Sequence, residues 1–492
     1  MSTTALMLTS LALMIGILLA AGQGTRMKSA DSKMLFQING EPMCFGAFKS
    51  LYELSDELCV VLGFQSEKVE VAIKEAALRY YSEAEFSKKV KFVKQDKQLG
   101  TADAVKTCFS QIKDSTFQDI LVLNGDMPLI HSELLNLFLK KAKQESLDSA
   151  CVSQEVQNPQ GLGRIFRDHR GVFQSILEEK DASLEEKKIN EINTGIYFFN
   201  KDFLLQEIEL LKNENKQNEF YLTDLLGQKN FQRSNAIQVK NSIEFMGVNN
   251  LYELSVARKY AQEKLQKKLA MDKGVQFLNP ASSFVEASVS FLGSCVIGPS
   301  VSISGNSVVE EGVFIEGAVK IENSKLMKNA CIKWGSVIED SEVGEASQVG
   351  PMAHLRPQSQ LGKNVKIGNF VELKKTTFGD NSKASHLSYL GDAEIAENVN
   401  IGCGVISVNY DGVQKHKSIV KKNAFVGSNS QLIAPVSIGE GAYVTAATVV
   451  TKNIPADALA ISRPELVIKE GYAKKLLQRF QAAKKSLQKD EV

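Results

Sequence analysis

The chain has 492 residues, of which 43% are hydrophobic and 23% are charged. This length exceeds what one hydrophobic core usually serves, so two or three domains are expected. The 58 lysines and arginines nearly balance the 57 aspartates and glutamates, which argues against a broad nucleic-acid-binding surface but leaves room for local phosphate pockets. The seven scattered cysteines form no CxxC pair, so they indicate neither a zinc site nor a disulfide framework and favour a reducing, cytoplasmic setting.

The N-terminal segment from Ala5 to Ala21 is apolar enough to be compared with a signal peptide or a membrane anchor. No basic residue precedes it, because the first one is Arg26, and Gly16 interrupts a run that is already short for a membrane span. We therefore interpret Leu13 to Leu19 as a buried parallel strand that leads into a glycine-rich loop. Insertion into a membrane is not expected.

From about residue 11 to residue 250, short β-rich runs alternate with helical stretches. The strand candidates are 58–62, 120–123 and 196–199, and the helix candidates are 68–81 and 132–145. This alternation predicts a Rossmann-like α/β domain with a mostly parallel sheet. Ligands of such domains bind at the carboxyl ends of the strands.

After about residue 275 the hydrophobic pattern repeats every six residues. Three series of aliphatic residues carry the repeat, Ile297 to Ile321, Val343 to Leu373 and Val426 to Val450, and many members are followed by glycine. This period predicts a left-handed parallel β-helix of hexapeptide repeats, with the aliphatic side chains inside and the small residue allowing each corner. The interval 403–425 breaks the rhythm, and we expect it to be an inserted functional loop.

These patterns together predict a domain plan. We expect the α/β domain over 1–249, a linker helix over 250–272, the β-helix over 273–465 and a C-terminal tail over 466–492. Apolar residues in the linker recur at three- and four-residue spacing, as in a helix that packs on one side.

The first chemical motif is LAAGQGTRM at 19–27, with Lys33 beyond it. It is neither a Walker loop nor a GxGxxG fingerprint. Gly22 and Gly24 allow backbone N–H groups to approach a polyphosphate, and Arg26 and Lys33 supply positive charge. The motif therefore predicts a polyphosphate-binding loop.

This loop resembles that of the sugar-nucleotide pyrophosphorylases, and further motifs follow in the same order. They are QLGTADA (98–104), LNGDMPLI (123–130), GLGRI (161–165), EEKDA (178–182), EINTGIY (191–197), FYLTD (220–224) and GVNNLYEL (247–254). With the C-terminal motifs below, the chain from about 13 to 472 resembles the bifunctional N-acetylglucosamine-1-phosphate uridylyltransferase/glucosamine-1-phosphate acetyltransferases. The resemblance implies synthesis of UDP-N-acetylglucosamine, a cell-wall precursor, from glucosamine 1-phosphate with acetyl-CoA and UTP as co-substrates.

The resemblance also implies roles for individual residues of the α/β domain. Asp126 and Asn249 would hold a Mg²⁺ that bridges the nucleotide and sugar phosphates. The residues implied for UTP and the UDP-sugar are Leu19, Ala20, Ala21, Gly22, Arg26, Lys33, Gln95, Gly100, Thr101, Gly163, Glu178, Asn193 and Asn249. Of these, the resemblance implies Gln95, Gly100 and Thr101 for the uracil and its ribose, and Gly163, Glu178 and Asn193 for the sugar. Ser32 departs from the family, which usually has proline before the lysine, and we expect the serine to loosen the loop.

The second site is expected on the β-helix, in LRPQSQLG (355–362), GNFVELKK (368–375) and the segment 385–412. His386 stands out among the five histidines because Lys374, Tyr389 and Asn400 lie within one or two predicted coils. Histidine titrates closest to neutral pH, which suits a general base. The resemblance implies that His386 takes a proton from the sugar's amine as it attacks the acetyl-CoA thioester.

Further roles at this site rest on the resemblance alone. It implies Arg356, Lys374, Tyr389 and Asn400 for the sugar phosphate, and Cys403, Asn409, Tyr410, Ser428, Ala446 and Arg463 for acetyl-CoA. Cys403 stands where the family commonly has alanine, and we interpret it as a small packed residue rather than a nucleophile. The resemblance also implies a homotrimer with the acetyl-transfer site between neighbouring copies.

Three alternatives remain at this point. In the first, the chain keeps only one of the two activities, but the presence of both sets of residues argues against that. In the second, the chain is a regulatory exchange-factor subunit, but such a subunit would not be expected to retain Arg26, Lys33, Asp126 and Asn249 together. In the third, the chain is a β-helical carbonic anhydrase, but its histidines lack the required grouping of three around a metal.

Overall fold

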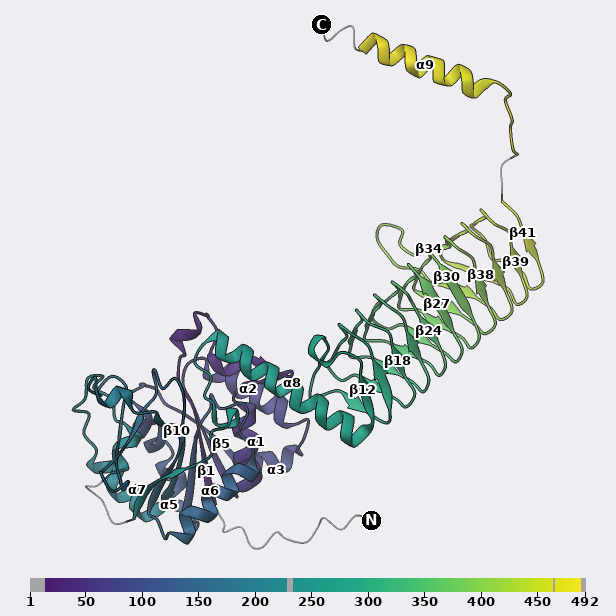
Figure 1. Cartoon of the computed structure of the whole chain (residues 1–492). Coiled ribbons are helices and arrows are strands. Elements are labelled where there is room, and N and C mark those ends of the chain that lie inside the picture. The colour runs from purple at the N-terminus through teal and green to yellow at the C-terminus, as the bar shows by residue number, and fades with distance from the viewer. Residues whose placement is uncertain (1–13, 228–232, 463–464, 488–492) are drawn as a thin grey trace. The chain divides into compact units, whose positions relative to one another are not determined.

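The computed structural model describes residues 14–227, 233–462 and 465–487 (Figure 1). The chain divides into two compact units. The first contains the residues up to Lys273 together with Phe284–Val289 and Ile303–Gly305, and the second contains the remainder.

The first unit contains a nine-stranded sheet with the main strand order β11-β7-β10-β6-β1-β4-β5. The strands are β1 Met14–Ala20, β4 Glu57–Leu62, β5 Val90–Lys94, β6 Asp119–Asn124, β7 Ser149–Glu155, β8 Arg164–Arg167, β9 Phe173–Leu177, β10 Glu191–Asn200 and β11 Ser234–Gln238. Strand β1 is entirely buried and pairs in parallel with β4 and β6. Strand β10 runs antiparallel to β6 and β7, so the sheet is mixed but mostly parallel. A separate hairpin pairs β2 Gln37–Ile38 with β3 Glu41–Pro42.

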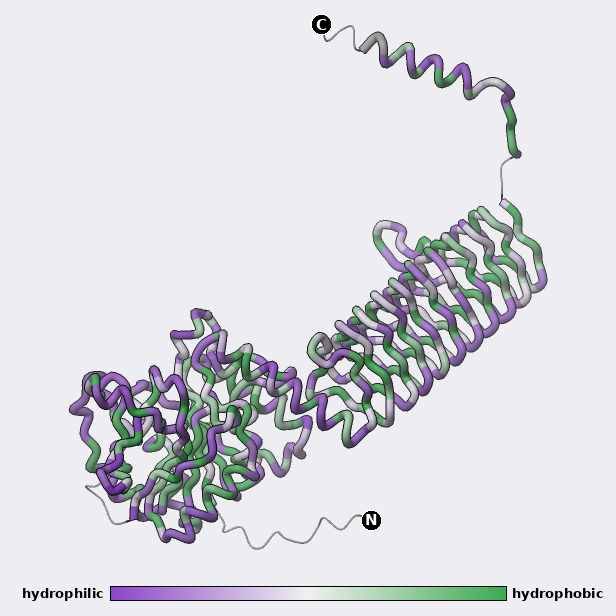
Figure 2. Tube along the Cα trace, in the orientation of Figure 1, coloured by the Kyte–Doolittle hydropathy of each residue, from purple (hydrophilic) through white to green (hydrophobic). Residues whose placement is uncertain are grey.

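Helices cover both faces of this sheet. They are α1 Phe45–Leu54, α2 Ser66–Ala77, α3 Glu83–Lys89, α4 Thr101–Lys106, α5 Phe109–Asp114, α6 Ser132–Gln144 and α7 Lys201–Glu207. Adjacent residues of β1 point to opposite faces: Leu18 belongs to a core with Phe48 of α1, and Ile17 to a second core with Val105 of α4. A strand buried on both sides needs an unbroken apolar sequence, which Figure 2 shows as green central strands. The predicted α/β fold is confirmed.

The second unit is a stack of short parallel strands in three sheets of 11, 10 and 9 strands. The first sheet contains β12 Val275–Phe277, β15 Cys295–Ile297, β18 Phe314–Ile315, β21 Cys331–Ile332, β24 Gln348–Val349, β27 Lys366–Asn369, β30 Lys383–His386, β33 Asn400–Ile401, β36 Phe425–Val426, β39 Tyr443–Val444 and β41 Leu459–Ala460. The second contains β13 Phe284–Val285, β16 Ser302–Ser304, β19 Lys320–Glu322, β22 Val337–Glu339, β25 His354–Leu355, β28 Glu372–Lys374, β31 Tyr389–Gly391, β34 Ile406–Val408, β37 Gln431–Ile433 and β40 Val449–Val450. The third contains β14 Ser290–Phe291, β17 Val308–Val309, β20 Lys325–Leu326, β23 Glu342–Val343, β26 Gln360–Leu361, β29 Thr377–Phe378, β32 Ala393–Ile395, β35 Ser418–Val420 and β38 Val436–Ile438.

The six-residue repeat forms the inside of this stack. All members of the three predicted series are buried, with at most 4% of any one exposed: Ile297, Ile303, Val309, Ile315, Ile321, Val343, Val349, Leu355, Leu361, Ile367, Leu373, Val426, Leu432, Ile438, Val444 and Val450. The predicted β-helix is therefore confirmed.

The glycines that follow the aliphatic residues act differently from the prediction. A β-carbon on Gly298 would lie 1.6 Å from the Glu316 carbonyl oxygen, so this glycine permits close stacking of successive coils. The left-handed corner comes two residues later, at Ser300, which has φ of 57°. The close approach between coils, rather than the corner, therefore requires a residue without a side chain.

Two further α-helices and one loop belong to the described structure. Helix α8 (Leu251–Lys273) buries Leu254 and Ala257, and α9 (Tyr472–Leu487) lies near the C-terminus. The loop between β34 and β35 projects from the coil in the region that interrupts the repeat (Figure 1). Within the described residues, no helix is both long enough and apolar enough to cross a bilayer.

Candidate active sites

The first site lies where the loops after β1 and β6 meet, at the carboxyl ends of these parallel strands. The Gly125 N–H donates to the Leu19 carbonyl at 2.9 Å, which brings the segment carrying Asp126 next to the start of the glycine-rich loop. The position of a β-carbon on Gly22 has no atom within 4 Å, so the loop backbone is open there to a ligand. This is the location expected for a ligand of an α/β sheet.

Gly24 and Lys33 are linked by packing. Gly24 has φ of 71°, and a β-carbon there would lie 2.8 Å from the aliphatic part of the Lys33 side chain. Only glycine avoids both the backbone strain and this collision. The glycine thus allows the lysine to lie across the loop with its ammonium group pointing into the site.

The structure corrects the expectation that Ser32 loosens this loop. Ser32 is fully buried, and its backbone N–H donates to Gln65 Oε1 at 2.9 Å, a bond that proline could not make. Its hydroxyl accepts from the Met34 N–H at the start of a short 3₁₀ helix, Lys33–Leu35. The segment before Lys33 is therefore held by hydrogen bonds instead of a proline ring.

One carboxylate, one amide and two basic side chains meet at this site. Lys33 Nζ lies 2.5 Å from Asp126 Oδ2, and Arg26 donates to Asn249 Oδ1 at 3.0 Å. Asp126 Oδ1 and Asn249 Nδ2 lie 3.6 and 3.8 Å from the point that a β-carbon on Gly247 would occupy. Asp126 and Asn249 therefore converge on one small region from loops 123 residues apart in the sequence.

This donor set fits a magnesium ion. A carboxylate and an amide carbonyl supply the oxygen ligands that Mg²⁺ prefers, and Mg²⁺ commonly takes only one or two protein ligands beside substrate phosphates and waters. Among the described residues, no three His, Cys, Asp or Glu side chains are grouped as a metal site. The two-ligand arrangement therefore suits an ion that arrives with a nucleotide.

The residues predicted for the uracil and ribose lie around the start of α4. Gln95 Nε2 donates to Asp103 at 2.8 Å and to the Gly100 carbonyl at 3.2 Å, and Thr101 Oγ1 accepts from the Leu222 N–H at 2.9 Å. Gln98, which sequence reasoning did not select, donates to the Ala21 carbonyl at 2.6 Å. Its position at the start of the QLGTADA motif was the available signal.

The residues predicted for the sugar form a second group. Glu178 accepts a hydrogen bond from the Thr223 hydroxyl at 3.0 Å, and a β-carbon on Gly163 would lie 3.6 Å from its carboxylate. Asn193 bonds to the Gly163 carbonyl through its backbone and to Tyr197 Oη through its side chain. Burial raises the pKa of the Glu178 carboxyl. Glu178 and Thr223 also line a cavity of about 850 Å³.

The loop that carries Gly163 is tied down by Arg164. This arginine is 1% exposed and lies 2.6 Å from Glu179, and it also donates to the Leu162 carbonyl. A buried guanidinium needs such partners, because an unpaired charge in the interior is costly. The Arg164–Glu179 pair joins the GLGRI and EEKDA motifs and so holds together the two segments that carry the residues predicted for the sugar.

The second site begins with His386, an exposed residue at the end of β30. His386 Nδ1 lies 2.7 Å from Asn369 Oδ1. Asn400 is on β33, the next strand of the same sheet, whereas Tyr389 is on β31 in the second sheet. The residues predicted to surround His386 thus come from neighbouring coils but from two faces of the β-helix.

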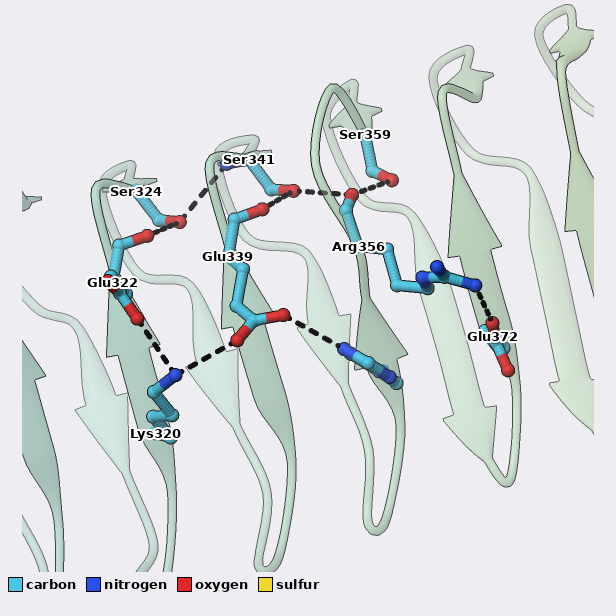
Figure 3. Close-up of polar contacts among 9 residues, drawn as sticks. Lys320, Glu322, Ser324, Glu339, Ser341, Arg356, Ser359 and Glu372 are labelled. Carbon is cyan, nitrogen blue, oxygen red and sulfur yellow. Dashed lines mark hydrogen bonds and ion pairs between the residues drawn. The ribbon is translucent and has the colours of Figure 1, made fainter.

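Basic side chains gather at the ends of neighbouring strands of the second sheet. Arg356 follows β25 and bonds to Glu372 at 2.9 Å, as Figure 3 shows, while Lys374 ends the next strand, β28. Lys415, from the inserted loop, lies against Lys374 and lowers its pKa, since two neighbouring ammonium groups repel. This concentration of positive charge suits a phosphate. Glu372 and Lys415 were not selected from the sequence.

The same coil face carries a longer polar network. Lys320 contacts Glu322 and Glu339 at 2.8 and 2.9 Å, and Glu339 also contacts His354 at 3.2 Å. Figure 3 shows serine hydroxyls linking successive coils above these charged groups. Arg356 therefore belongs to a face whose polar side chains are already held in position from coil to coil.

Three residues predicted for acetyl-CoA lie in one column. The Asn429 N–H donates to the Cys403 carbonyl, and the Ala447 N–H donates to the Ser428 carbonyl, so Cys403, Ser428 and Ala446 occupy equivalent positions on successive coils. Asn409 is buried and donates to Asp392 at 2.6 Å, whereas Tyr410 in the loop is 56% exposed. Arg463 lies outside the described residues.

A nucleotidyltransferase-type sheet followed by a hexapeptide β-helix defines a two-domain transferase. The family model described as nucleotidyl transferase matches residues 15–245. The "Bifunctional protein GlmU" of Caldicellulosiruptor saccharolyticus is 40% identical over 467 residues, covering 94% of this chain and 98% of that protein. Those of Shouchella clausii and Staphylococcus epidermidis are 39% and 41% identical over 462 residues, covering 93% of this chain and 98% and 99% of theirs.

The chain belongs to the bifunctional GlmU family. The resemblance drawn from the motifs is therefore confirmed, and with it the enzyme class, a bifunctional transferase of UDP-N-acetylglucosamine synthesis that uses UTP and acetyl-CoA.

Proposed function

We propose that the two reactions take place at the two groups of residues described above. The β-helix transfers the acetyl group from acetyl-CoA to glucosamine 1-phosphate. The α/β domain then transfers the uridylyl group from UTP to N-acetylglucosamine 1-phosphate and releases pyrophosphate. The convergence of Arg26, Lys33, Asp126 and Asn249 carries the first assignment. The placement of Arg356, Lys374, His386 and Cys403 on four successive coils carries the second.

In uridylyl transfer the chain mainly positions its substrates and stabilises charge. Arg26 and Lys33 bind phosphate oxygens, while Glu178, Asn193 and the Gly163 backbone orient the sugar so that its phosphate faces the α-phosphorus of UTP in line. Asp126 and Asn249 would hold Mg²⁺, which would supply positive charge to the phosphates. Lys33, which pairs with Asp126 in the structure, lies next to the proposed metal region.

In acetyl transfer the chain supplies a base and two binding regions. Arg356 and Lys374 clamp the sugar phosphate, with Tyr389 and Asn400 on the sugar. His386 accepts a proton from the amine as its nitrogen attacks the thioester carbonyl, and the thiol of coenzyme A leaves. The column of Cys403, Ser428 and Ala446, with Asn409, Tyr410 and Arg463, binds acetyl-CoA.

Assay of both reactions on one preparation tests this function. We expect purified protein to release pyrophosphate from UTP with N-acetylglucosamine 1-phosphate, and free thiol from acetyl-CoA with glucosamine 1-phosphate. A chelator of divalent ions should abolish the first reaction and leave the second unchanged, because only the first site is proposed to use Mg²⁺. Added Mg²⁺ should restore pyrophosphate release. A chelator-resistant uridylyl transfer would contradict the metal assignment.

Glu178→Gln is expected to weaken binding of the sugar phosphate and, at the same time, to stabilise the fold. We expect the KM for N-acetylglucosamine 1-phosphate to rise about 10- to 100-fold, as when a hydrogen bond to a charged group is lost. Because burial raises the folded-state pKa of Glu178, its ionised form destabilises the fold above that pKa, and the effect disappears below the ordinary carboxyl pKa. The variant should therefore unfold at a higher temperature at pH 7, with the difference closing on acidification. The exposed Glu185→Gln is the control, and equal midpoints at pH 7 would contradict the prediction.

We also propose that the protein is a homotrimer with the acetyl-transfer site between copies. Phe370 and Leu387, at the corner beside His386, are 57% and 58% exposed, and such apolar side chains are expected to be covered. Both have positive φ, which asparagine tolerates, so Phe370→Asn with Leu387→Asn should fold. We expect sedimentation to give three times the chain mass for the wild type and one chain for the double variant, with acetyl transfer lost. Met271→Asn, exposed on α8, is the control; a variant that stays trimeric contradicts this interface.

The free cysteines of the described structure agree with a cytoplasmic setting, which we also propose.

A further inference from the structure

Two strands of the coil are longer than the others. β27 (Lys366–Asn369) and β30 (Lys383–His386) each have four residues, whereas the other described strands of the β-helix have two or three. The additional length carries the pairing to the corner, where Asn369 is the register partner of His386. The proposed base therefore stands on a paired strand end and not on a free turn.

The backbone around this pair is tightly fastened. A β-carbon on Gly368 would lie 1.9 Å from the Ser385 carbonyl oxygen, so the glycine allows the two strands to approach closely. Beyond the pair, the Leu387 N–H donates to the Asn369 carbonyl at 3.0 Å. Contacts on both sides thus fix the separation of Asn369 and His386.

The side chains of this pair meet through specific atoms. Asn369 Oδ1 lies 2.7 Å from His386 Nδ1. An amide oxygen can only accept, so Nδ1 carries the hydrogen and donates it. A neutral imidazole has a single N–H, which leaves the lone pair on Nε2.

We propose that Asn369 is a positioning residue for acetyl transfer, which holds His386 in the tautomer whose Nε2 accepts the proton from the sugar's amine. The inference rests on the proposed role of His386. It adds a second residue that touches neither substrate and acts only through the orientation and tautomer of the imidazole.

The chemistry of the partner explains the choice of an amide. A carboxylate at this distance would stabilise the protonated imidazole, which cannot act as a base, whereas a neutral amide orients the ring without adding charge. The other titratable groups on this sheet near the pair are Lys366 and Lys383, three residues before it, and Cys403, just after β33. The strands that follow the pair along the chain carry Glu372, Lys374 and Tyr389. Lys366 and Lys383 are partners of each other in the register.

Two substitutions test the proposal by the pH dependence of acetyl transfer. Asn369→Asp should move the acid limb of kcat/KM to higher pH by about one unit, because the protonated imidazole is stabilised. Asn369→Ala should lower kcat about tenfold, the cost of one lost hydrogen bond, with the KM for acetyl-CoA unchanged. A purely structural role would not move the pH limb.

Gln348→Glu on β24 is the matched control, since it adds the same charge at an exposed position of the same sheet and should leave the pH profile in place. Unchanged uridylyl transfer by each variant would show that the purified protein is folded. An unshifted pH profile of Asn369→Asp overturns the inference. Because aspartate has nearly the same shape as asparagine, this variant still tests the inference if Asn369→Ala does not fold. Full acetyl transfer by His386→Ala would instead overturn the proposed function itself.

Discussion

Arg26→Ala is expected to lower kcat/KM for uridylyl transfer by about 10²- to 10³-fold, the loss typical of removing one preorganised donor to a charged transition state. The Arg26 guanidinium bonds to Asn249, and a β-carbon on Gly161 would lie 3.5 Å from it. It therefore stands between the proposed metal region and the loop of the sugar site. Pyrophosphate release measures the loss, and acetyl transfer should remain unchanged.

Two further substitutions show whether this effect belongs to Arg26. Arg26→Lys keeps the charge but not the planar fork of donors, so it should recover only part of the activity. Arg170→Ala removes an exposed arginine whose ion pair is with Asp168 at 3.6 Å, and it should leave both reactions intact. Loss of both reactions in folded Arg26→Ala would contradict two independent sites.

His386→Ala is expected to lower acetyl transfer by about 10²- to 10⁴-fold, the contribution that a general base usually makes. The residual reaction should rise with pH, because the amine of the substrate must then lose its proton to solvent. Release of the coenzyme A thiol measures the loss, while pyrophosphate release on the same preparation should equal that of the wild type.

The matched control for this substitution is His354→Ala. His354 lies on the same β-helix, but its ring contacts Glu339, which Lys320 also holds. We expect this variant to keep acetyl transfer within a few-fold of the wild type. If His354→Ala lost as much activity as His386→Ala, the assignment of His386 as the base would have to be abandoned.

The β-helix could be predicted because its rule is local. Each six-residue unit must place one aliphatic side chain inside the coil, so residues such as Ile297, Val349 and Val444 reveal the period wherever it occurs. The buried strand β1 was readable for a similar reason, since a strand covered on both faces has to be apolar throughout. The direction of β10 was not readable, because a buried apolar run is the same in a parallel or an antiparallel strand.

Sequence reasoning found the candidate site residues that stand in a motif. It missed those whose importance comes only from their neighbours in three dimensions. Arg26, Lys33 and His386 stand in recognisable patterns. Lys415 does not, because its importance comes from lying against Lys374, 41 positions earlier in the chain. Glu372 was likewise missed, because what marks it is its ion pair with Arg356, a residue of the preceding coil.

By itself, the amino-acid sequence determined the two architectures and the chemical types of residue available to each, since apolar period and loop composition are properties of neighbouring residues. The tertiary structure alone decided which of those residues meet. Lys33 reaches Asp126 across 93 positions and Asn369 pairs with His386 across 17. Such meetings depend on strand order and on how coils stack, which are set by packing over the whole domain and leave no local pattern.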